Sequence, residues 1–295
     1  MDLLNAIIMG LVQGIAEFLP VSSSGHLAIM KHILHMEETG LFFDVLLHLG
    51  TLIAIFIAFW KDILELIVEG FRIIGDFFVN VGRVISNFFR LVSGTKKKRE
   101  YKRIITTPYR RFVMLIIVST IPTAFIGVVF EDAIDFVSTT LLVPGLCLIL
   151  TGILLSIADR VKTGKKTEEN VSYTEAGAIG LAQGIATFPG LSRSGTTITA
   201  CLLAGFDRDF AVKYSFIMSI PAVLGAAVLK MKDFSMASVT QTDLMNYMIG
   251  TIVAAVVGFI SIKTMLVIVR GKKFKYFAYY CFVIGVIAVI GYFVI

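Results

Sequence analysis

Charged side chains are scarce in this sequence: Lys, Arg, Asp and Glu make up only 16% of its 295 residues, whereas a soluble domain carries about a quarter. That scarcity excludes an ordinary water-soluble globular protein. Hydrophobic residues take up 57% of the chain instead, and several apolar runs approach the roughly 20 residues that span a bilayer as a helix. The composition therefore predicts an all-α polytopic membrane protein that forms one integral membrane domain over residues 1–295.

Cysteine is also rare, and its placement excludes a metal or disulfide framework. The three cysteines, Cys147, Cys201 and Cys281, lie in apolar segments and lack the spacing of metal ligands. We therefore expect them to be buried as small hydrophobic residues. The first residues lack the basic region and the small-residue cleavage site of a secretory signal, so we expect the first helix to be retained.

The net charge of +6 comes from one segment rather than from a broad basic surface. Residues 95–111 carry eight basic residues and one acid, and the remainder of the chain has a net charge of −1. Such a run is typical of a juxtamembrane loop beside anionic lipid, and no nucleic-acid partner is predicted. Together with the basic loops at 160–166 and 270–275, it predicts that these three loops face the cytoplasm.

Apolar runs with few charges predict six transmembrane helices. The six are Leu41–Trp60, Phe112–Phe130, Phe136–Ala158, Phe210–Leu229, Met245–Val269 and Tyr276–Ile295. Between the first two, residues 62–92 repeat charged side chains among apolar ones at helical spacing. This insert is predicted to be an amphipathic helix at the membrane interface, followed by the basic loop 93–111.

An internal repeat organises the chain. Residues 10–26 align without gaps to residues 180–196, with ten of seventeen positions identical, which indicates a duplication. The first repeat covers about 1–135 and the second about 136–295. Each aligned segment is interrupted by Pro, Gly and Ser, and the basic loops place the two segments on opposite sides of the membrane. The sequence thus predicts an inverted-topology repeat with two re-entrant broken-helix hairpins.

The two interruptions are predicted to meet in a polar pocket. Irregular backbone inside a membrane is tolerated only where it is buried in protein or lines a wet cavity; the alternative is two kinked spans held by packing alone. After each interruption, Pro and then Ser mark the start of a helix. Two helix N-termini with free N–H groups would then face one cavity and bind an anion such as phosphate.

The second interruption contains an arginine, Arg193, within a predicted membrane segment. A buried guanidinium is costly, so we interpret it as a phosphate-binding group; the alternative is a structural ion pair with a carboxylate such as Glu17. Hydroxyl groups around both interruptions would add donors, although the serines at a helix start could act only as caps. The hydroxyl residues are Ser22, Ser24, Ser192, Ser194, Thr196 and Thr197.

The first interruption carries the residues that can move protons. Gln13 and Glu17 share one helix face, with Gln13 as a hydrogen-bonding support for the phosphate site. His26 follows Ser22 by four residues and Ser23 by three, so its imidazole can reach either hydroxyl. Such a pair is the minimum for an activated nucleophile, and Glu17 could orient the imidazole, accept a proton or bind a divalent cation.

The second copy of the repeat lacks these groups, because Thr187 and Thr196 stand where the first copy has Glu17 and His26. One copy would therefore supply acid, base and nucleophile, and the other would hold phosphate. Elsewhere, Asp44 and His48 are one helical turn apart in a predicted span, and we expect them to satisfy each other or to line the cavity mouth.

Three sequence blocks, at residues 13–26, 43–51 and 189–194, closely resemble those of the bacterial undecaprenyl-diphosphatases of the bacitracin-resistance type. The resemblance covers nearly the whole chain. It implies a phosphatase of the cell membrane that removes the terminal phosphate of undecaprenyl diphosphate and so recycles the lipid carrier of cell-wall synthesis. It further implies dependence on a divalent cation, Mg²⁺ or Ca²⁺, and a site that opens to the extracytoplasmic face.

Carried over by position, the resemblance assigns catalytic roles to Glu17, Ser23, His26 and Arg193, with Glu17 also as metal ligand. Gln13 departs from the family pattern, since many members have a second carboxylate there, and this weakens any scheme in which two acids bind the metal. The attacking group stays open among Ser23, His26 and a water molecule.

Two other functional classes remain. A transporter or lipid flippase would use the same inverted repeats and broken helices, but it would not need a one-sided set of Ser, His and Glu. A structural scaffold would leave Glu17 and Arg193 unexplained. The expected partners are a polyprenyl diphosphate and membrane lipids, with the oligomeric state open and a homodimer possible.

Overall fold

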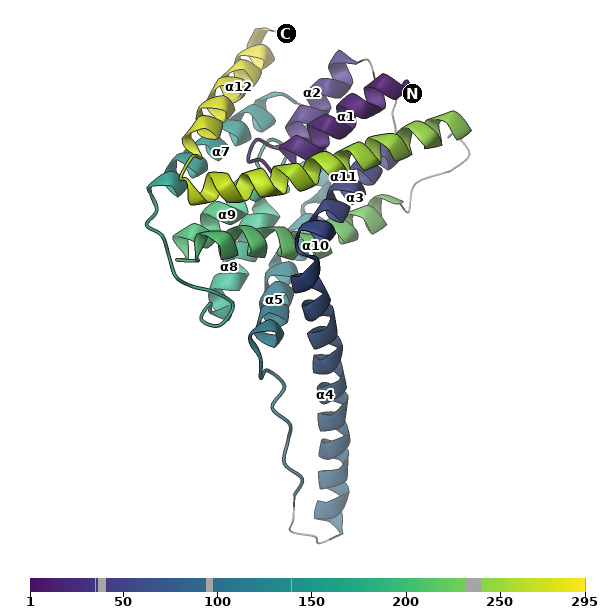
Figure 1. Cartoon of the computed structure of the whole chain (residues 1–295), viewed down its shortest axis with the longest axis vertical. Helices are drawn as coiled ribbons and strands as arrows, with labels where there is room; N and C mark the ends of the chain where they lie inside the picture. Colours follow the sequence, from purple (N-terminus) through teal and green to yellow (C-terminus); the bar gives the residue numbers. More distant parts are fainter. Residues whose placement is uncertain (35, 37–40, 94–97, 139, 232–239, 295) are drawn as a thin grey trace.

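The computed structural model describes residues 1–294 except 35, 37–40, 94–97, 139 and 232–239. This part of the chain is helical apart from connections and one isolated bridge between Lys166 and Phe206 (Figure 1). The helices are α1 Leu3–Ala16, α2 Ser23–Ile33, α3 Leu41–Ala58, α4 Trp60–Val92, α5 Pro108–Val129, α6 Glu131–Ser138, α7 Leu142–Arg160, α8 Tyr173–Ile185, α9 Arg193–Leu203, α10 Arg208–Met231, α11 Gln241–Arg270 and α12 Lys275–Val294.

Five of these helices, α5, α7, α10, α11 and α12, are long and apolar enough to cross a membrane. Helices α3 and α4, which a 90° bend separates, meet the same length and apolarity criteria only when they are taken together. Counted as one span, they bring the number to six. The prediction of an all-α polytopic membrane protein is confirmed. Cys201 and Cys281 are buried as expected, whereas Cys147 is half-buried.

The predicted boundaries of two segments are wrong. The span expected to begin at residue 136 begins at Leu142, because α6 ends at Ser138 and Pro144 lies in the first turn of α7, where a proline is tolerated. Hydropathy does not reveal this break, since both sides of it are apolar. The basic loop ends before Pro108 rather than at residue 111, because a proline at the first helical position starts α5 and Thr107 caps it.

Each interrupted segment forms a hairpin of two short helices, α1 with α2 and α8 with α9. In the second hairpin the chain turns at Gly190, whose φ of +86° favours glycine. A Cβ at Gly190 would also lie 2.2 Å from the main-chain oxygen of Pro144. The turn can therefore pack against α7 only because residue 190 has no side chain.

The two halves exchange packing partners. Helix α1 of the first half packs along α11 of the second, and α8 of the second half packs along α5 of the first. Glycines allow both approaches, since a Cβ at Gly10 would lie 2.4 Å from the Gly250 oxygen and one at Gly180 would lie 2.1 Å from the Ser119 oxygen. Small residues at such contacts are typical of packed membrane helices.

We expect Gly180→Ala to destabilise the protein by about 1–3 kcal/mol, because the new methyl group would force α8 away from the α5 backbone. Thermal unfolding of the detergent-purified protein measures the effect as a lower melting temperature. Gly127→Ala is the matched control, since Gly127 lies on α5 with no atom within 4 Å of its built Cβ. Equal melting temperatures for the two variants would contradict the close α5–α8 approach.

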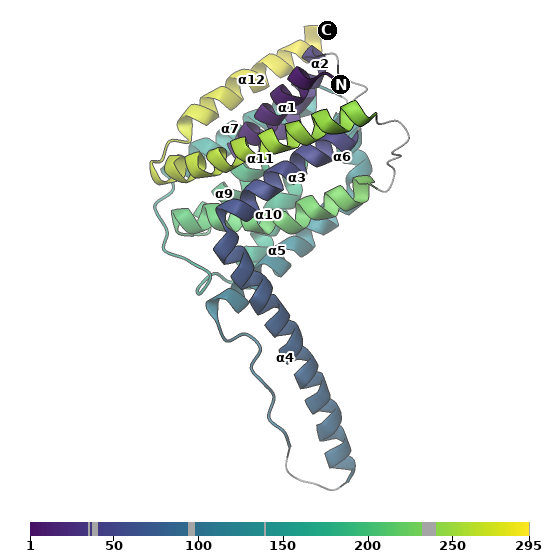
Figure 2. The ribbon, with the colours of Figure 1, turned by 45° about the vertical axis from the view of Figure 1, so that its right-hand side comes forward.

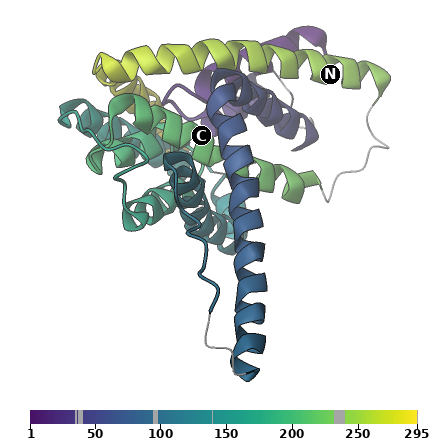
Figure 3. The same cartoon turned by 60° about the horizontal axis from the view of Figure 1, so that its bottom comes forward.

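The chain termini and the basic connections lie at opposite ends of the helix bundle. In Figure 2 both termini lie at the upper right, whereas the α7–α8 and α11–α12 connections, which carry basic residues, lie at the left. Helix α4 projects away from the other helices in all three views, and the chain returns beside it to α5 (Figures 1, 2 and 3).

Candidate active site

The site lies where the tips of the two hairpins meet. Glu17 caps the C-terminus of α1, Ser23 is the first residue of α2, and Arg193 is the first residue of α9. The Arg193 guanidinium donates through Nη2 to Glu17 Oε1, and Ser23 Oγ donates to Glu17 Oε2 at 2.6 Å. One carboxylate thus joins a candidate nucleophile from the first repeat to the arginine of the second.

Glu17 is only 7% exposed, and each of its oxygens has a partner. Besides Ser23, Oε2 accepts a hydrogen bond from Gln13 Nε2 at 3.2 Å. The ion pair between Glu17 and Arg193, which the sequence left as an alternative, is therefore present. It does not saturate the guanidinium, however, because Arg193 Nη1 is buried without a partner. A buried donor of this kind is suited to an anionic oxygen.

Paired serines flank the first residue of α2 and of α9 in the same arrangement. Ser22 Oγ lies 3.3 Å from Ser24 Oγ, and Ser192 Oγ lies 3.3 Å from Ser194 Oγ. Ser192 also caps α9 by accepting from the Gly195 N–H at 3.1 Å.

Ser22 makes no such cap, because its φ of +70° places it in the left-handed region. This conformation costs a non-glycine residue on the order of 1–3 kcal/mol, and such strain clusters at functional sites. Its consequence is that no serine side chain blocks the first N–H groups of α2.

The two threonines of α9 differ in what their hydroxyls can do. Thr196 Oγ1 is buried without a partner and can donate to a phosphate oxygen. Thr197 Oγ1 instead lies 2.8 Å from the main-chain oxygen of Arg193 and 2.5 Å from Ser215 Oγ. The expectation that Thr197 contacts phosphate directly is therefore not met, since its hydroxyl bonds back to the preceding helical turn.

His26 has different partners from those expected. Its Nδ1 lies 2.7 Å from the main-chain oxygen of Ser22, and its Nε2 lies 2.5 Å from the Tyr280 hydroxyl of α12. Because a carbonyl only accepts, Nδ1 carries a proton and donates it to Ser22, which leaves Nε2 to pair with the Tyr280 hydroxyl. The imidazole bonds neither to the Ser22 nor to the Ser23 hydroxyl, and Tyr280 is a site residue that sequence reasoning missed.

His48 takes one of the two places expected for it. Its Nε2 lies 3.9 Å from Glu17 Oε2, while its Nδ1 donates to the main-chain oxygen of Asp44 at 2.8 Å. The Asp44 and His48 side chains do not pair with each other, because the Asp44 carboxylate pairs with Lys31 at 2.5 Å. His48 instead lines the site beside Glu17, which agrees with the alternative that it lines the cavity mouth.

A divalent cation would find few protein ligands here. Within the described residues no group of three or more His, Cys, Asp or Glu side chains could hold a metal ion. The buried Gln13 Oε1, however, has no partner, and the same amide donates to Glu17. One carboxylate and one amide oxygen suit an ion such as Mg²⁺, which takes its other ligands from substrate phosphates and water.

The equivalent position in the second hairpin is chemically inert. Thr187, which replaces Glu17, donates its hydroxyl to the main-chain oxygen of Gly184 at 2.6 Å. Gln183, the counterpart of Gln13, donates to Thr123 at 3.3 Å. Proton-carrying groups therefore gather on the first repeat, and the second contributes Arg193 and hydroxyl donors.

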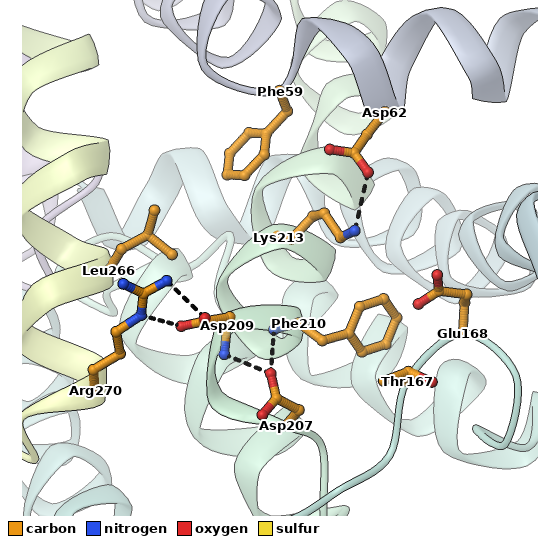
Figure 4. A pocket seen from close by; sticks show the side chains of 10 residues that line it. All are labelled: Phe59, Asp62, Thr167, Glu168, Asp207, Asp209, Phe210, Lys213, Leu266 and Arg270. Carbon is orange, nitrogen blue, oxygen red and sulfur yellow. Dashed lines mark hydrogen bonds and ion pairs between the residues drawn. The ribbon is translucent and has the colours of Figure 1, made fainter.

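A separate cavity of about 420 Å³ lies beside the α3–α4 bend (Figure 4). Its basic groups are already paired, Lys213 with Asp62 at 2.9 Å and Arg270 with Asp209 at 2.6 Å. The lining contains none of the residues predicted for the site. Since four acidic residues but only two basic residues line this cavity, its net charge disfavours phosphate, and it is not the phosphate site.

Comparison with known proteins adds independent information. The family described as bacitracin resistance protein BacA matches residues 6–287. An undecaprenyl-diphosphatase of Methanosphaera stadtmanae is 42% identical over 291 residues, which is 98% of each chain. Another, of Carboxydothermus hydrogenoformans, is 39% identical over 290 residues, covering 97% of this chain and 96% of that protein.

Proposed function

Since the chain belongs to the bacitracin resistance protein BacA family, we propose that the hairpin tips form the active site of an undecaprenyl-diphosphate phosphatase. The protein is a multi-pass membrane enzyme that hydrolyses undecaprenyl diphosphate to undecaprenyl phosphate and inorganic phosphate. The observation that supports this site best is the contact of Glu17 with both Ser23 and Arg193, with one guanidinium nitrogen left unpartnered.

Substrate binding uses donors that have no hydrogen-bond partner among the described residues. Arg193 Nη1 and Thr196 Oγ1 bind oxygens of the diphosphate, and the N–H groups at the start of α2 and α9 add their partial positive charge. Ser22 and Ser24 add hydroxyls on either side of Ser23, and Ser192 and Ser194 add hydroxyls on either side of Arg193. These groups are fixed before the substrate arrives, so they stabilise the transferred phosphoryl without reorganisation.

The chemical step begins at Ser23. Its Oγ attacks the terminal phosphorus while its proton passes to Glu17 Oε2, the oxygen it already contacts at 2.6 Å. The anhydride P–O bond breaks, and undecaprenyl phosphate leaves. Water then attacks the phosphoserine, and inorganic phosphate departs as the proton returns to Ser23. His26, one turn further along α2, assists with Nε2 as a second proton carrier.

A divalent cation fits beside these residues. Glu17 and Gln13 Oε1 would hold it against the phosphate oxygens, and when bound it would neutralise part of the diphosphate charge.

The basic connections between helices predict how the protein is oriented in the membrane. With these at the cytoplasmic face of the cell membrane, both termini lie outside, and α2 leads from the hairpin tips toward that outer edge (Figure 2). The site therefore opens to the extracytoplasmic side. The prenyl tail of the substrate lies along apolar helix surfaces that face lipid.

Detergent-solubilised protein mixed with a polyprenyl diphosphate tests this function. We expect release of inorganic phosphate that stops when a chelator removes divalent cations and resumes when Mg²⁺ or Ca²⁺ is returned. A transporter or flippase built on the same inverted repeats needs two compartments and would release none. Binding of the diphosphate without phosphate release would therefore favour the carrier and contradict the enzyme.

A further inference from the structure

Helix α4 carries its polar residues on one narrow stripe. Between Asp62 and Arg90, the charged and amide side chains follow one another at intervals of three or four residues, so they lie along a single face. Large apolar side chains occupy the other faces and are exposed, among them Phe71, Phe78 and Phe89, which are 72%, 66% and 65% exposed. Apolar surface of this extent indicates an interaction site.

The polar stripe is covered by the chain that returns from α4. Asn87 Nδ2 donates to the Arg99 oxygen at 2.9 Å, and its Oδ1 accepts from the Arg99 N–H at 2.7 Å. Asn80 pairs with the main chain of Lys102 in the same two-way manner, at 2.8 Å for each bond. The two asparagines thus hold the return segment as a neighbouring strand would.

Ion pairs also hold the return segment to α4 where α4 lies closest to the other helices. Asp76 pairs with Lys102 and with Arg110, each at 2.8 Å, and Glu69 pairs with Arg110 at 2.6 Å. Hydrogen bonds from these cations hold the pKa of Asp76 below its usual value. Helix α4 and residues 98–107 therefore form one unit, the α4 arm, with an apolar side and a basic side.

The direction of the α4 arm points to the bilayer surface. Helix α4 leaves the apolar helix α3 at a 90° bend, so it runs along the membrane plane if α3 crosses the membrane. The return segment lies on the left of α4 in Figure 2, as do the basic α7–α8 and α11–α12 connections. The apolar side opposite this segment then faces the lipid.

We propose that the α4 arm is a lipid-binding element that lies in the headgroup region of the cytoplasmic leaflet and gathers anionic lipid. Phe71, Phe78 and Phe89 enter the acyl chains, and the exposed Lys98 and Arg103 attract acidic headgroups. Charge complementarity favours anionic lipid over a protein partner, because the described end of the return segment, 98–103, carries four basic residues and one acid.

The single tryptophan of the chain, Trp60, makes the position of the α4 arm measurable. In a Trp60→Phe background, Phe78→Trp places a fluorophore on the apolar side, and Tyr101→Trp places one on the exposed return segment. We reconstitute each full-length variant in vesicles whose lipids carry bromine on the acyl chains. We expect strong quenching for Phe78→Trp and weak quenching for Tyr101→Trp. Equal, weak quenching of both would place the arm in water or against protein and overturn the proposal.

Anionic preference is tested in vesicles of phosphatidylcholine with about one fifth phosphatidylglycerol. Bromine is placed on only one of the two lipids in each experiment. Quenching of Phe78→Trp by the brominated phosphatidylglycerol should exceed that expected for random mixing by about twofold or more. Quenching at the random level would overturn the selection of anionic lipid.

Two charge variants test whether the attraction of anionic lipid comes from the α4 arm or from basic residues anywhere on the same face of the protein. Lys98→Gln/Arg103→Gln should reduce the quenching by phosphatidylglycerol to the random level, whereas Lys162→Gln/Lys165→Gln, which removes the same charge from the α7–α8 connection, should leave it unchanged. Equal loss in both variants would overturn a role for this segment. Phosphate release should stay at the unsubstituted level in each, which shows that the fold is intact.

Discussion

Arg193→Ala is expected to lower phosphate release by about 10³-fold or more, an effect on the order of that of an arginine that stabilises phosphoryl transfer in other enzymes. Arg193 is the residue of the second hairpin tip that forms an ion pair with Glu17, and its Nη1 has no hydrogen-bond partner among the described residues. Alanine removes both interactions. The assay is inorganic phosphate release from a polyprenyl diphosphate in detergent.

Two further variants show whether the geometry or only the charge of Arg193 matters. Arg193→Lys keeps a cation but loses the planar fork that can bond Glu17 and phosphate together, so we expect it to remain impaired by about 10-fold or more. Arg270→Ala removes another arginine that pairs with a carboxylate, Asp209, but at the separate cavity. It should retain near-normal turnover. Comparable activity of Arg193→Ala and Arg270→Ala would refute the assignment.

Ser23→Ala is expected to reduce phosphate release on the order of 10³-fold, because the attacking oxygen is lost while the Glu17–Arg193 pair remains. Acid quenching of the unsubstituted enzyme during turnover, followed by mass spectrometry, should reveal phosphate on Ser23. The same treatment of Ser23→Ala should reveal none at this peptide.

The matched control is Ser156→Ala, since the Ser156 hydroxyl bonds to the Gly152 main chain within α7, away from the site. It should keep its activity. If Ser23→Ala retained turnover within about 10-fold of the unsubstituted enzyme, a water molecule activated at Glu17 would replace Ser23 as the nucleophile.

The sequence predicted the hairpins and the meeting of Glu17 with Arg193 because these features repeat. The repeat aligns without gaps and has Pro, Gly and Ser at matched positions. These residues favour a turn in the local backbone, so they predict where the helices break. The basic loops predicted opposite insertion of the two copies, which would place both breaks at one depth. Residues near a break could therefore be assigned to one pocket without knowledge of side-chain contacts.

The contacts of Tyr280 with His26 and of His48 with Glu17 could not be found in this way, because each residue occupies a single position within an apolar helix. Tyr280 is 254 residues from His26, its hydrogen-bond partner, and no periodicity connects them. Their place depends on how α12 and α3 pack against the hairpins. The difference between Thr196 and Thr197 is likewise decided by helix geometry, since only one of the hydroxyls reaches back to the previous turn.

The exchange of partners between the two halves constrains how the protein can fold. A chain of half this length, with α1 but without α11, would leave the glycine face of α1 open to lipid, and the same holds for α8 without α5. A second copy inserted upside down would supply the missing helix to each. The halves therefore depend on each other for folding: neither hairpin can bury its glycine face until the other half of the chain is also in the membrane.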